Sequence, residues 1–325
     1  MKFMLDLAID TPAQKINYND PIMLIGSCFT EHIGDGLNRL KFNILQNPNG
    51  ILFDPESVSA SLISYIKNKV YKIEDLICVN ELWHSWNHHS VFSHTNIETC
   101  LHQINRSMAH AADYLGKARW LIITLGSSFS YQLRQSGKAV ANCHRAPAQW
   151  FNKHLLSVEE IQAKLDNCIH QLFHFNPSLN IVLTISPVRH IRDGVTENNR
   201  SKARLIESVH NLCAKFGHIY YFPAYEIVID VLRDYRFFDV DMVHPNYQCT
   251  QYVFQEFLKN FIDEDSQRVA AEVTEIVAAM NHTPSNPETE AHKKFLKTFH
   301  HKVARLSEKY NFLEFKRELE YFGGT

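Results

Sequence analysis

Four short runs of apolar residues recur along the chain up to residue 222, and each one ends at a glycine, a serine or a proline. They cover residues 22–25, 120–125, 181–185 and 219–222. Short unbroken apolar runs are typical of strands that are buried on both faces of a sheet. These runs therefore predict the central strands of a parallel sheet, and residues 42–45 predict one further short strand.

Between these runs the apolar residues recur every three or four positions, which is the spacing of a helix that packs one face on a sheet. Two of these segments carry start signals, because Asp54 precedes Pro55 and because Ser157-Val-Glu-Glu160 has the form of a capping box. Strands that alternate with helices indicate an α/β fold with helices on both faces of the sheet. The predicted helices cover residues 30–40, 55–69, 96–116, 157–173 and 199–215.

Two stretches interrupt this alternation. Residues 76–94 contain strand-like pieces at 76–79 and 90–92 around two tryptophans, and they predict a hairpin-like insertion. Residues 129–142, which turn at Gly137, predict a second hairpin.

The pattern changes again beyond Pro245, where the chain becomes charged and amphipathic. Helices are predicted over 252–262, 267–280 and 288–310. We therefore expect an α/β domain over residues 1–250, which starts with an irregular lead-in, and a helical extension over residues 251–325.

The composition narrows the class of protein. The formal net charge is -2, and lysine and arginine are spread among aspartate and glutamate, so no nucleic-acid partner is expected. No apolar run approaches the roughly 20 residues of a membrane span. The first residues carry an acid where a signal peptide has its apolar core, so a cytoplasmic location is expected. The seven cysteines include no CxxC pair and indicate neither a disulfide framework nor a cysteine-rich zinc site.

The 19 histidines stand out, and His84, His88 and His89 cluster on either side of Trp86. The HExxH spacing is absent and no neighbouring acid completes a usual ligand set, so we expect no metal site and no cofactor. We expect Trp83 and Trp86 to pack against the rest of the fold and not to form a platform for a sugar.

Candidate chemistry begins where the first strand breaks at Gly26. Ser27 and Cys28 follow at once, at the start of the next helix. A side chain there lies at the carboxyl end of a strand, beside free N–H groups and the positive end of a helix. That is a favourable place for a nucleophile.

A second signal is the loop after the last strand, where Asp241 and His244 stand three residues apart. An acid that orients an imidazole and a histidine that activates a nucleophile can both come from one such loop. Because ligands bind at the carboxyl ends of parallel strands, we expect this loop to meet the turn after Gly26.

Six motifs stand in order along residues 20 to 250, and they are Gly26-Ser-Cys-Phe-Thr30, Asn142-Cys-His144, Ser186-Pro-Val-Arg-His190, Ser201-Lys-Ala203, Tyr221-Phe-Pro-Ala-Tyr-Glu226 and Asp241-Met-Val-His-Pro245. Together they resemble the GSCFA domain family of bacteria, which is related to the SGNH (GDSL-like) hydrolases. The resemblance implies a three-layer α/β/α, flavodoxin-like fold. It also implies an esterase or acyltransferase that acts on an O-acyl group of a carbohydrate, a lipid or a small metabolite. Thr30 stands where the family name has alanine.

The resemblance also implies a nucleophile-His-Asp triad. With glycine placed on glycine, Cys28 falls on the nucleophile, whereas a shift by one residue would make it Ser27. We favour Cys28, and we expect His244 and the helix start to lower the pKa of its thiol. Asp241 would orient the imidazole of His244, which would deprotonate the nucleophile and then protonate the leaving alcohol.

The related hydrolases hold the oxyanion with N–H groups and an asparagine. The matching glycines are Gly50 and Gly126, but the asparagine is absent from Gly126-Ser-Ser-Phe129. Ser128 or Asn142 would have to supply the side-chain donor. Losing such a donor slows acyl transfer by about 10²–10³-fold. The missing asparagine keeps open an alternative, a non-catalytic binding or assembly module that retains the fold.

Other polar residues follow the strand ends. His144 and the pair Arg189 and His190 are candidates for contact with a substrate. Lys202 and Arg204 are expected on a solvated helix face. The sequence says nothing about the oligomeric state.

Overall fold

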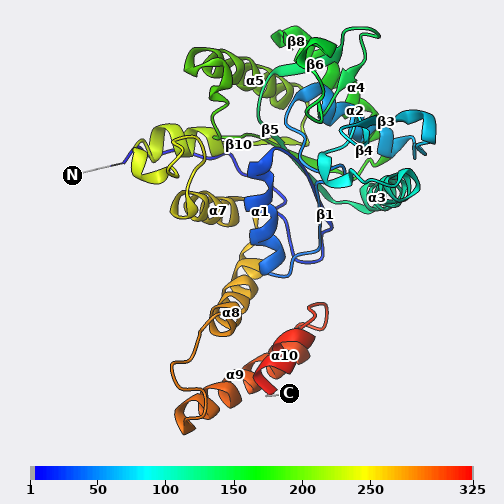
Figure 1. Cartoon of the computed structure of the whole chain (residues 1–325). Helices are drawn as coiled ribbons and strands as arrows, with labels where there is room; N and C mark the ends of the chain where they lie inside the picture. Colours follow the sequence, from blue (N-terminus) through cyan, green and yellow to red (C-terminus); the bar gives the residue numbers. More distant parts are fainter. Residues whose placement is uncertain (1–3, 324–325) are drawn as a thin grey trace.

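A five-stranded parallel sheet forms the centre of the protein, with the strand order β10-β9-β5-β1-β2 (Figure 1). The structure is a computed structural model that describes residues 4–323, so the ends of the predicted lead-in and extension lie outside it. The chain order reverses between β1 and β5, which places a switch point at their carboxyl ends. The strands are β1 Ile22–Gly26, β2 Ile44–Gln46, β5 Trp120–Leu125, β9 Asn180–Ile185 and β10 Ile219–Phe222.

Helices cover both faces of the sheet, which confirms the three-layer α/β/α prediction. Alternate residues of β1 point to opposite faces. Ile22 and Leu24 therefore pack in one apolar core with α1 and α7, and Met23 and Ile25 pack in another with α2 to α5. The helices of the two layers are α1 Cys28–Arg39, α2 Pro55–Ile66, α3 Ile97–Lys117, α4 Val158–Phe175, α5 Val195–Lys215 and α7 Tyr247–Phe261, and a single turn, α6 Ala224–Glu226, follows β10.

Helix α2 begins at the predicted start signal. Asp54 is its N-cap and accepts a hydrogen bond from the Ser57 N–H at 3.0 Å, and Pro55 occupies the first helical position. The cap is buried, and burial raises the pKa of the Asp54 carboxyl to about 6.

This buried cap predicts a specific pH dependence of stability. Because the pKa of Asp54 is higher in the folded state than the ordinary value near 4, its contribution to stability falls as the pH rises from about 4 through 6. Asp54→Asn keeps the cap and removes the charge. We expect this variant to be more stable than the wild type at pH 7 by on the order of 2 kcal/mol and equal near pH 4, measured by urea unfolding. Equal pH slopes in both proteins would contradict the interpretation.

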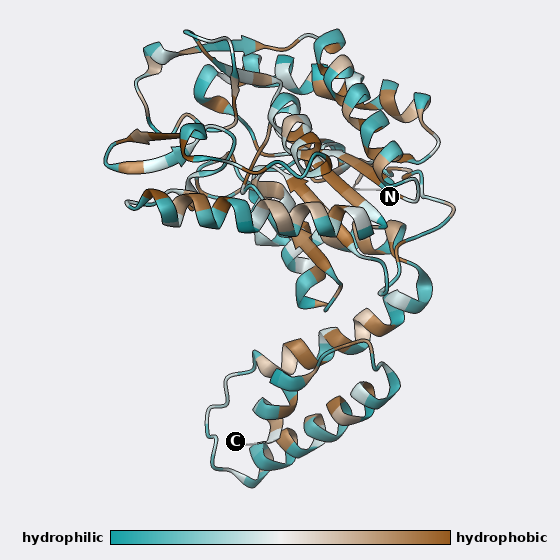
Figure 2. Ribbon diagram, turned by 90° about the vertical axis from the view of Figure 1, so that its right-hand side faces the viewer, coloured by the Kyte–Doolittle hydropathy of each residue, from teal (hydrophilic) through white to brown (hydrophobic). Residues whose placement is uncertain are grey.

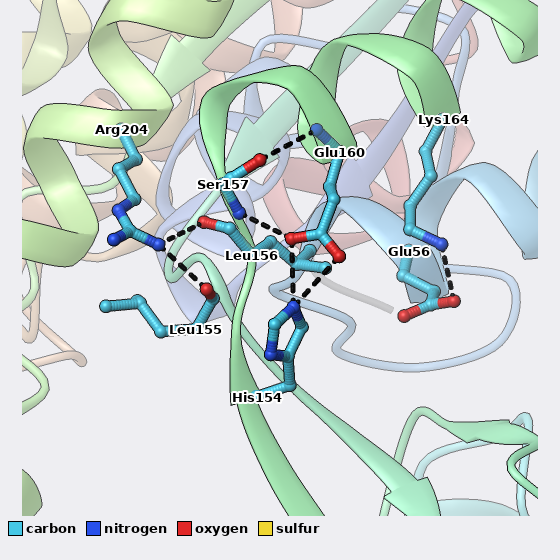
Figure 3. Close-up of polar contacts among 8 residues, drawn as sticks. All are labelled: Glu56, His154, Leu155, Leu156, Ser157, Glu160, Lys164 and Arg204. Atoms are coloured by element: carbon cyan, nitrogen blue, oxygen red, sulfur yellow. Dashed lines mark hydrogen bonds and ion pairs between the residues drawn. The ribbon is translucent and has the colours of Figure 1, made fainter.

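Helix α4 begins at the predicted capping box, which Figure 3 shows. Ser157 Oγ accepts from the Glu160 N–H at 3.2 Å, and the Glu160 carboxylate accepts from the Ser157 N–H at 2.7 Å. In the same view, Arg204 of α5 donates to the backbone oxygens of Leu155 and Leu156, at 2.8 Å each. The prediction of a solvated Arg204 is therefore wrong, because its guanidinium ties α5 to the segment before α4.

The insertion over 76–94 is a hairpin of β3 Leu76–Val79 and β4 Leu82–Ser85, paired antiparallel. Residues 90–92 form a 3₁₀ turn, so the strand predicted there is wrong. Asn80 and Glu81 both take positive φ, 50° and 64°, and turn the chain back before it reaches that segment.

The second hairpin is confirmed, with β6 Phe129–Leu133 and β7 Ala139–Val140. A third strand, β8 Phe151–Leu155, also pairs with β6 and was not predicted. The three central residues of β8 are polar and exposed, so the strand lacks the alternation of apolar and polar residues that would identify it.

The C-terminal region is helical as predicted and extends away from the sheet (Figures 1 and 2). It comprises α8 Glu264–Met280, α9 Glu290–Lys309 and α10 Lys316–Gly323, of which α10 is short, charged and not predicted. The apolar sides of these helices face one another (Figure 2). An ion pair of 2.9 Å between Lys41 and the buried Glu318 of α10 joins the region to the end of α1.

The first helix beyond the predicted domain boundary lies on the α/β domain. Phe257 of α7 contacts the ring of Phe222 in β10 with 5.2 Å between centroids. The predicted boundary at residue 250, between the α/β domain and the helical extension, therefore stays a prediction. No helix within residues 4–323 has the length and apolar character needed to cross a bilayer.

Candidate functional site

The turn after β1 is fixed by contacts that tolerate only glycine at its first position. Gly26 has a φ of 149°, and a Cβ there would lie 2.2 Å from the Thr124 oxygen of β5. Its N–H donates to Asn47 Oδ1 at 2.9 Å, and the next N–H, of Ser27, donates to Thr124 O at 3.0 Å. The start of α1 is thereby held against the carboxyl ends of β2 and β5.

Ser27 and Cys28 have different environments. Ser27 is the N-cap of α1, its Oγ accepts from the Phe29 N–H at 3.3 Å, and the residue is 2% exposed. Cys28 is the first residue of the helix and is half-buried. The serine hydroxyl is engaged in starting the helix, which leaves the cysteine as the more accessible of the two.

The pKa of the Cys28 thiol is raised in the free protein. Burial is the largest cause and the Glu31 carboxylate adds to it, whereas Lys202 and the N–H groups of Phe29 and Cys28 act in the opposite direction. The expectation of a lowered thiol pKa is therefore wrong for this state, because burial outweighs the helix start.

Asp241 and His244 form a hydrogen-bonded pair with 2.6 Å between Asp241 Oδ2 and His244 Nδ1. The other carboxylate oxygen accepts from the N–H groups of Val243 and His244, at 2.9 and 3.0 Å. These bonds, those from His244 first, lower the pKa of Asp241 to about 2. A carboxylate fixed in this way directs a proton to Nδ1 of the imidazole and leaves Nε2 free to take one from a nucleophile.

Arg189 holds the loop that carries this pair. Its N–H and its guanidinium donate to the backbone oxygens of Val243 and Met242, at 3.3 and 2.9 Å, and the guanidinium lies 3.9 Å from the ring centroid of Phe238. The structure therefore gives Arg189 a role in anchoring the loop beside the end of β9.

Burial is the largest cause that lowers the pKa of His32 on α1 and of His190 after β9, and His244 contributes to both shifts. The loop held by Arg189 lies at the carboxyl edge of the sheet, which is the edge at which α1 begins. Within residues 4–323, neither Ser27 Oγ nor Cys28 Sγ is hydrogen-bonded to His244 in this state.

A pocket of about 360 Å³ opens over the carboxyl ends of the strands. It contains three aromatic rings and four charged side chains, so it suits a ligand with both apolar and polar parts. Its lining is Phe53, Ser127, Phe129, Tyr131, Lys153, Arg189, His190, Ile191, Arg192 and Asp193.

Gly126 lies where this pocket meets the turn after β1. A Cβ at Gly126 would lie 2.9 Å from Phe53 Cβ, 3.2 Å from His190 Nε2 and 3.2 Å from Ser27 Cβ. The missing side chain lets these three groups converge. Burial, followed by the charge of Lys202, lowers the pKa of His190 to about 4, so this imidazole is neutral at neutral pH.

The predicted oxyanion donors are engaged in other bonds. The N–H of Gly50 donates to Asn47 O, and that of Gly126 donates to Phe53 O, both at 2.7 Å. Ser128 is fully buried, and its N–H and hydroxyl bond to Ser201. As long as these bonds persist, none of the three groups is free to stabilise an oxyanion.

The remaining sequence candidates, Asn142 and His144, pack on the β3–β4 hairpin. Asn142 N–H donates to Trp86 O at 3.3 Å, and Asn142 Oδ1 accepts from the His144 N–H at 2.8 Å. The His144 ring stacks on His84 at 4.3 Å and bonds to Ser85 O at 2.8 Å. All of these contacts stabilise the insertion.

The histidine cluster is occupied by similar bonds. Both ring nitrogens of His84 contact protein oxygens, Ser93 Oγ at 2.6 Å and Val79 O at 3.1 Å. His88 is fully buried and bonds through Nδ1 to Ser85 Oγ at 2.9 Å. Among residues 4–323, no group of three or more histidine, cysteine, aspartate or glutamate side chains is placed to hold a metal ion.

The structure also brings to the site residues that were not predicted to lie there. Asn47 holds the Gly26 N–H, and Phe53 accepts from Gly126 and lines the pocket. Lys202 is 1% exposed and donates to Gly126 O at 2.5 Å and Ser186 O at 2.6 Å, so the prediction of a solvated Lys202 is wrong.

Comparison with protein families matches residues 21–257 to the GSCFA family and residues 273–323 to the GSCFA domain protein, C-terminal domain. No curated protein matches the chain. Among solved structures, an acetyl xylan esterase (Est2A) from the rumen bacterium Butyrivibrio proteoclasticus is similar. It is 12% identical, with a TM-score of 0.37, over 74% of this chain and 63% of that one. The chain thus spans less than two thirds of that esterase, and this distant likeness carries no argument about activity.

Proposed function

The chain belongs to the GSCFA family, and with this as the premise we propose that it is an esterase or acyltransferase that acts on an O-acyl group. The observation that carries the proposal is the pair Asp241–His244, whose imidazole is oriented through a 2.6 Å bond in a loop at the carboxyl edge of the sheet, where α1 also begins. Such a pair has one frequent chemical use, which is to move a proton to and from a nucleophile.

Cys28 is the proposed nucleophile, because Ser27 is buried and caps α1. In the proposed mechanism His244 accepts the thiol proton, the thiolate attacks the acyl carbon, and His244 returns the proton to the departing alcohol. Water or an acceptor hydroxyl then takes the acyl group from sulfur. Hydrogen bonds of this kind are often longer in free enzymes, so the proposal places the Cys28–His244 contact in the substrate complex.

The oxyanion of the tetrahedral intermediate needs a donor at the same place. The Cys28 N–H lies at the positive end of α1, and within the described part of the chain no backbone oxygen accepts from it; it acts on the thiol of its own residue. This group is the proposed donor, since those of Gly50 and Gly126 are bonded.

The pocket beside Gly126 supports a substrate of mixed polarity. Phe53, Phe129 and Tyr131 offer apolar walls to an acyl group, while Lys153 and Arg192 offer donors to the oxygens of a polar acceptor. A carbohydrate or small-metabolite ester fits this lining.

Turnover of a small aryl acetate tests the proposal. We expect release of the phenol by the native protein at a rate well above that of buffer and of the same protein after heat unfolding. The reaction is followed by the absorbance of the phenolate at constant pH. Equal rates in the three samples would exclude the proposed hydrolysis of this ester.

A second candidate is a binding module that keeps the fold without the chemistry. The bonded N–H groups of Gly50 and Gly126 and the raised pKa of the Cys28 thiol favour it. The two candidates differ in one respect, because only the enzyme forms a covalent acyl intermediate.

A further inference from the structure

Lys202 of α5 is a buried cation at the centre of the site. Its side chain is 1% exposed, and Nζ donates to two backbone oxygens that end neighbouring strands, Gly126 after β5 and Ser186 after β9. A buried ammonium is costly unless other groups compensate for the lost water. Two carbonyl bonds use two of the three donor positions on Nζ, and no acceptor for the third occurs among residues 4–323.

The usual partner of a buried lysine is missing. Within residues 4–323, no carboxylate lies within ion-pair distance of Lys202 Nζ. Burial accordingly lowers the pKa of Lys202 to about 7, and of the titratable groups in residues 4–323 the Cys28 thiolate acts against this.

Lys202 is linked through Gly126 to the turn that carries Ser27 and Cys28. Gly126, whose oxygen accepts from Nζ, lies against Ser27, and Ser27 N–H donates to Thr124 O in the same strand end. Cys28 follows Ser27 on α1, and the charge of Lys202 lowers the pKa of its thiol. The cation and the thiol therefore share one buried region beneath the pocket.

We propose that Lys202 is a positioning residue that holds positive charge beneath the nucleophile and stabilises the Cys28 thiolate without contacting the substrate. This inference deepens the proposed function, on which it rests for the choice of Cys28. No bond is made or broken at Lys202. The ammonium favours the anionic form of sulfur, and the neutral amine does not.

The coupling has a distinctive pH dependence, because Lys202 loses its charge near neutral pH. Below about pH 7 the ammonium raises the thiolate fraction of Cys28, and above this pH the benefit disappears as the amine forms. The Glu31 carboxylate also acts on the thiol and opposes thiolate formation, and burial raises the pKa of this carboxyl. Burial, followed by the charge of Lys202, lowers the pKa of His190 to about 4, so its imidazole is neutral near pH 7, where Lys202 loses its charge.

Alkylation of Cys28 by iodoacetamide measures its thiolate directly and needs no ester. For the wild type we expect the rate at Cys28, read by peptide mass spectrometry, to rise about tenfold per pH unit below pH 7, to flatten near pH 7–8, and to rise again above. Because His244 also lies at the site, the same profile is measured in His244→Gln, where the flat region should remain. A rate that rises without a flat region, or a thiol that is never alkylated, overturns the proposal.

Lys202→Met removes the charge and the two carbonyl bonds. We expect Cys28 alkylation to be about tenfold slower than in the wild type at pH 6 and nearly equal at pH 9. The matched control is Arg204→Met, which also removes two backbone-carbonyl bonds from α5, at 2.8 Å each. Its ratio to the wild type should not change with pH.

The outcomes separate this proposal from the proposed function. A Lys202→Met ratio that is constant from pH 6 to pH 9 shows a merely structural role and refutes the coupling, even if esters are turned over. If esters are not turned over but the pH-dependent ratio is found, the coupling stands and the proposed function fails. If Lys202→Met does not fold, the flat region of the wild-type profile still decides.

Discussion

His244→Ala is expected to lower the kcat for an aryl acetate by about 10³-fold, the typical scale of a positioned general base and acid. The bond of 2.6 Å to Asp241 orients the imidazole, and no other histidine within the described chain has an aspartate placed in this way. KM should change little, because the imidazole acts in the chemical step. The ring is exposed, so the thermal midpoint should stay close to that of the wild type.

The chain offers a matched control for this variant. His154 is also an exposed histidine that pairs with a carboxylate, Glu160, at 2.9 Å (Figure 3). It stands in β8, and His154→Ala should leave kcat near the wild-type value. Equal losses in the two variants would show that the effect arises from altered stability or charge, and an unaffected His244→Ala would contradict the proposed mechanism.

Cys28→Ala is expected to abolish turnover, while Ser27→Ala keeps most of it and lowers the free energy of unfolding by about 1 kcal/mol. The difference follows from the structure, in which Ser27 Oγ caps α1 and Cys28 is the more accessible side chain. Turnover is measured with the same ester, and stability by urea unfolding. Cys213→Ala, which removes another half-buried thiol, is the control for loss of a cysteine. Activity that survives Cys28→Ala but not Ser27→Ala would identify serine as the nucleophile.

The sequence predicts the sheet well because its strands are unbroken apolar runs. The runs at 120–125 and 219–222 coincide with β5 and β10. Every residue of β5 is buried, and β10 is buried at both of its ends. The same signal fails for β8, whose outward residues are polar, and for α10, which spans only 316–323. Neither has enough apolar residues to show a period.

In the candidate site, contacts within one loop could be predicted from the sequence, and contacts between distant segments could not. Asp241 and His244 stand in one loop, so their spacing alone indicates the pair. The partners of the proposed oxyanion donors come from elsewhere in the chain. Gly126 N–H bonds to Phe53 O, and Ser128 bonds to Ser201. Such contacts depend on tertiary packing, which no local pattern reveals.

Lys202 is an intermediate case, since a signal was present in the sequence. Apolar residues Leu205, Val209 and Leu212 continue from it at helical spacing, and all three are buried. A lysine in line with such a stripe lies on the buried face of its helix. Sequence spacing could therefore have indicated that Lys202 is buried, but not that the Gly126 and Ser186 oxygens receive it.

The central claim is that Cys28 carries the acyl group, and intact-mass measurement of the protein quenched in acid during turnover tests it most directly. With an aryl acetate in excess, we expect one added acetyl group, which peptide analysis maps to Cys28. In His244→Ala this acetyl group should accumulate further if deacylation is the slower step. In Cys28→Ala it should be absent. Turnover of the ester with acetyl mapped to Ser27, or with no acyl group on Cys28 at any time, would contradict the account.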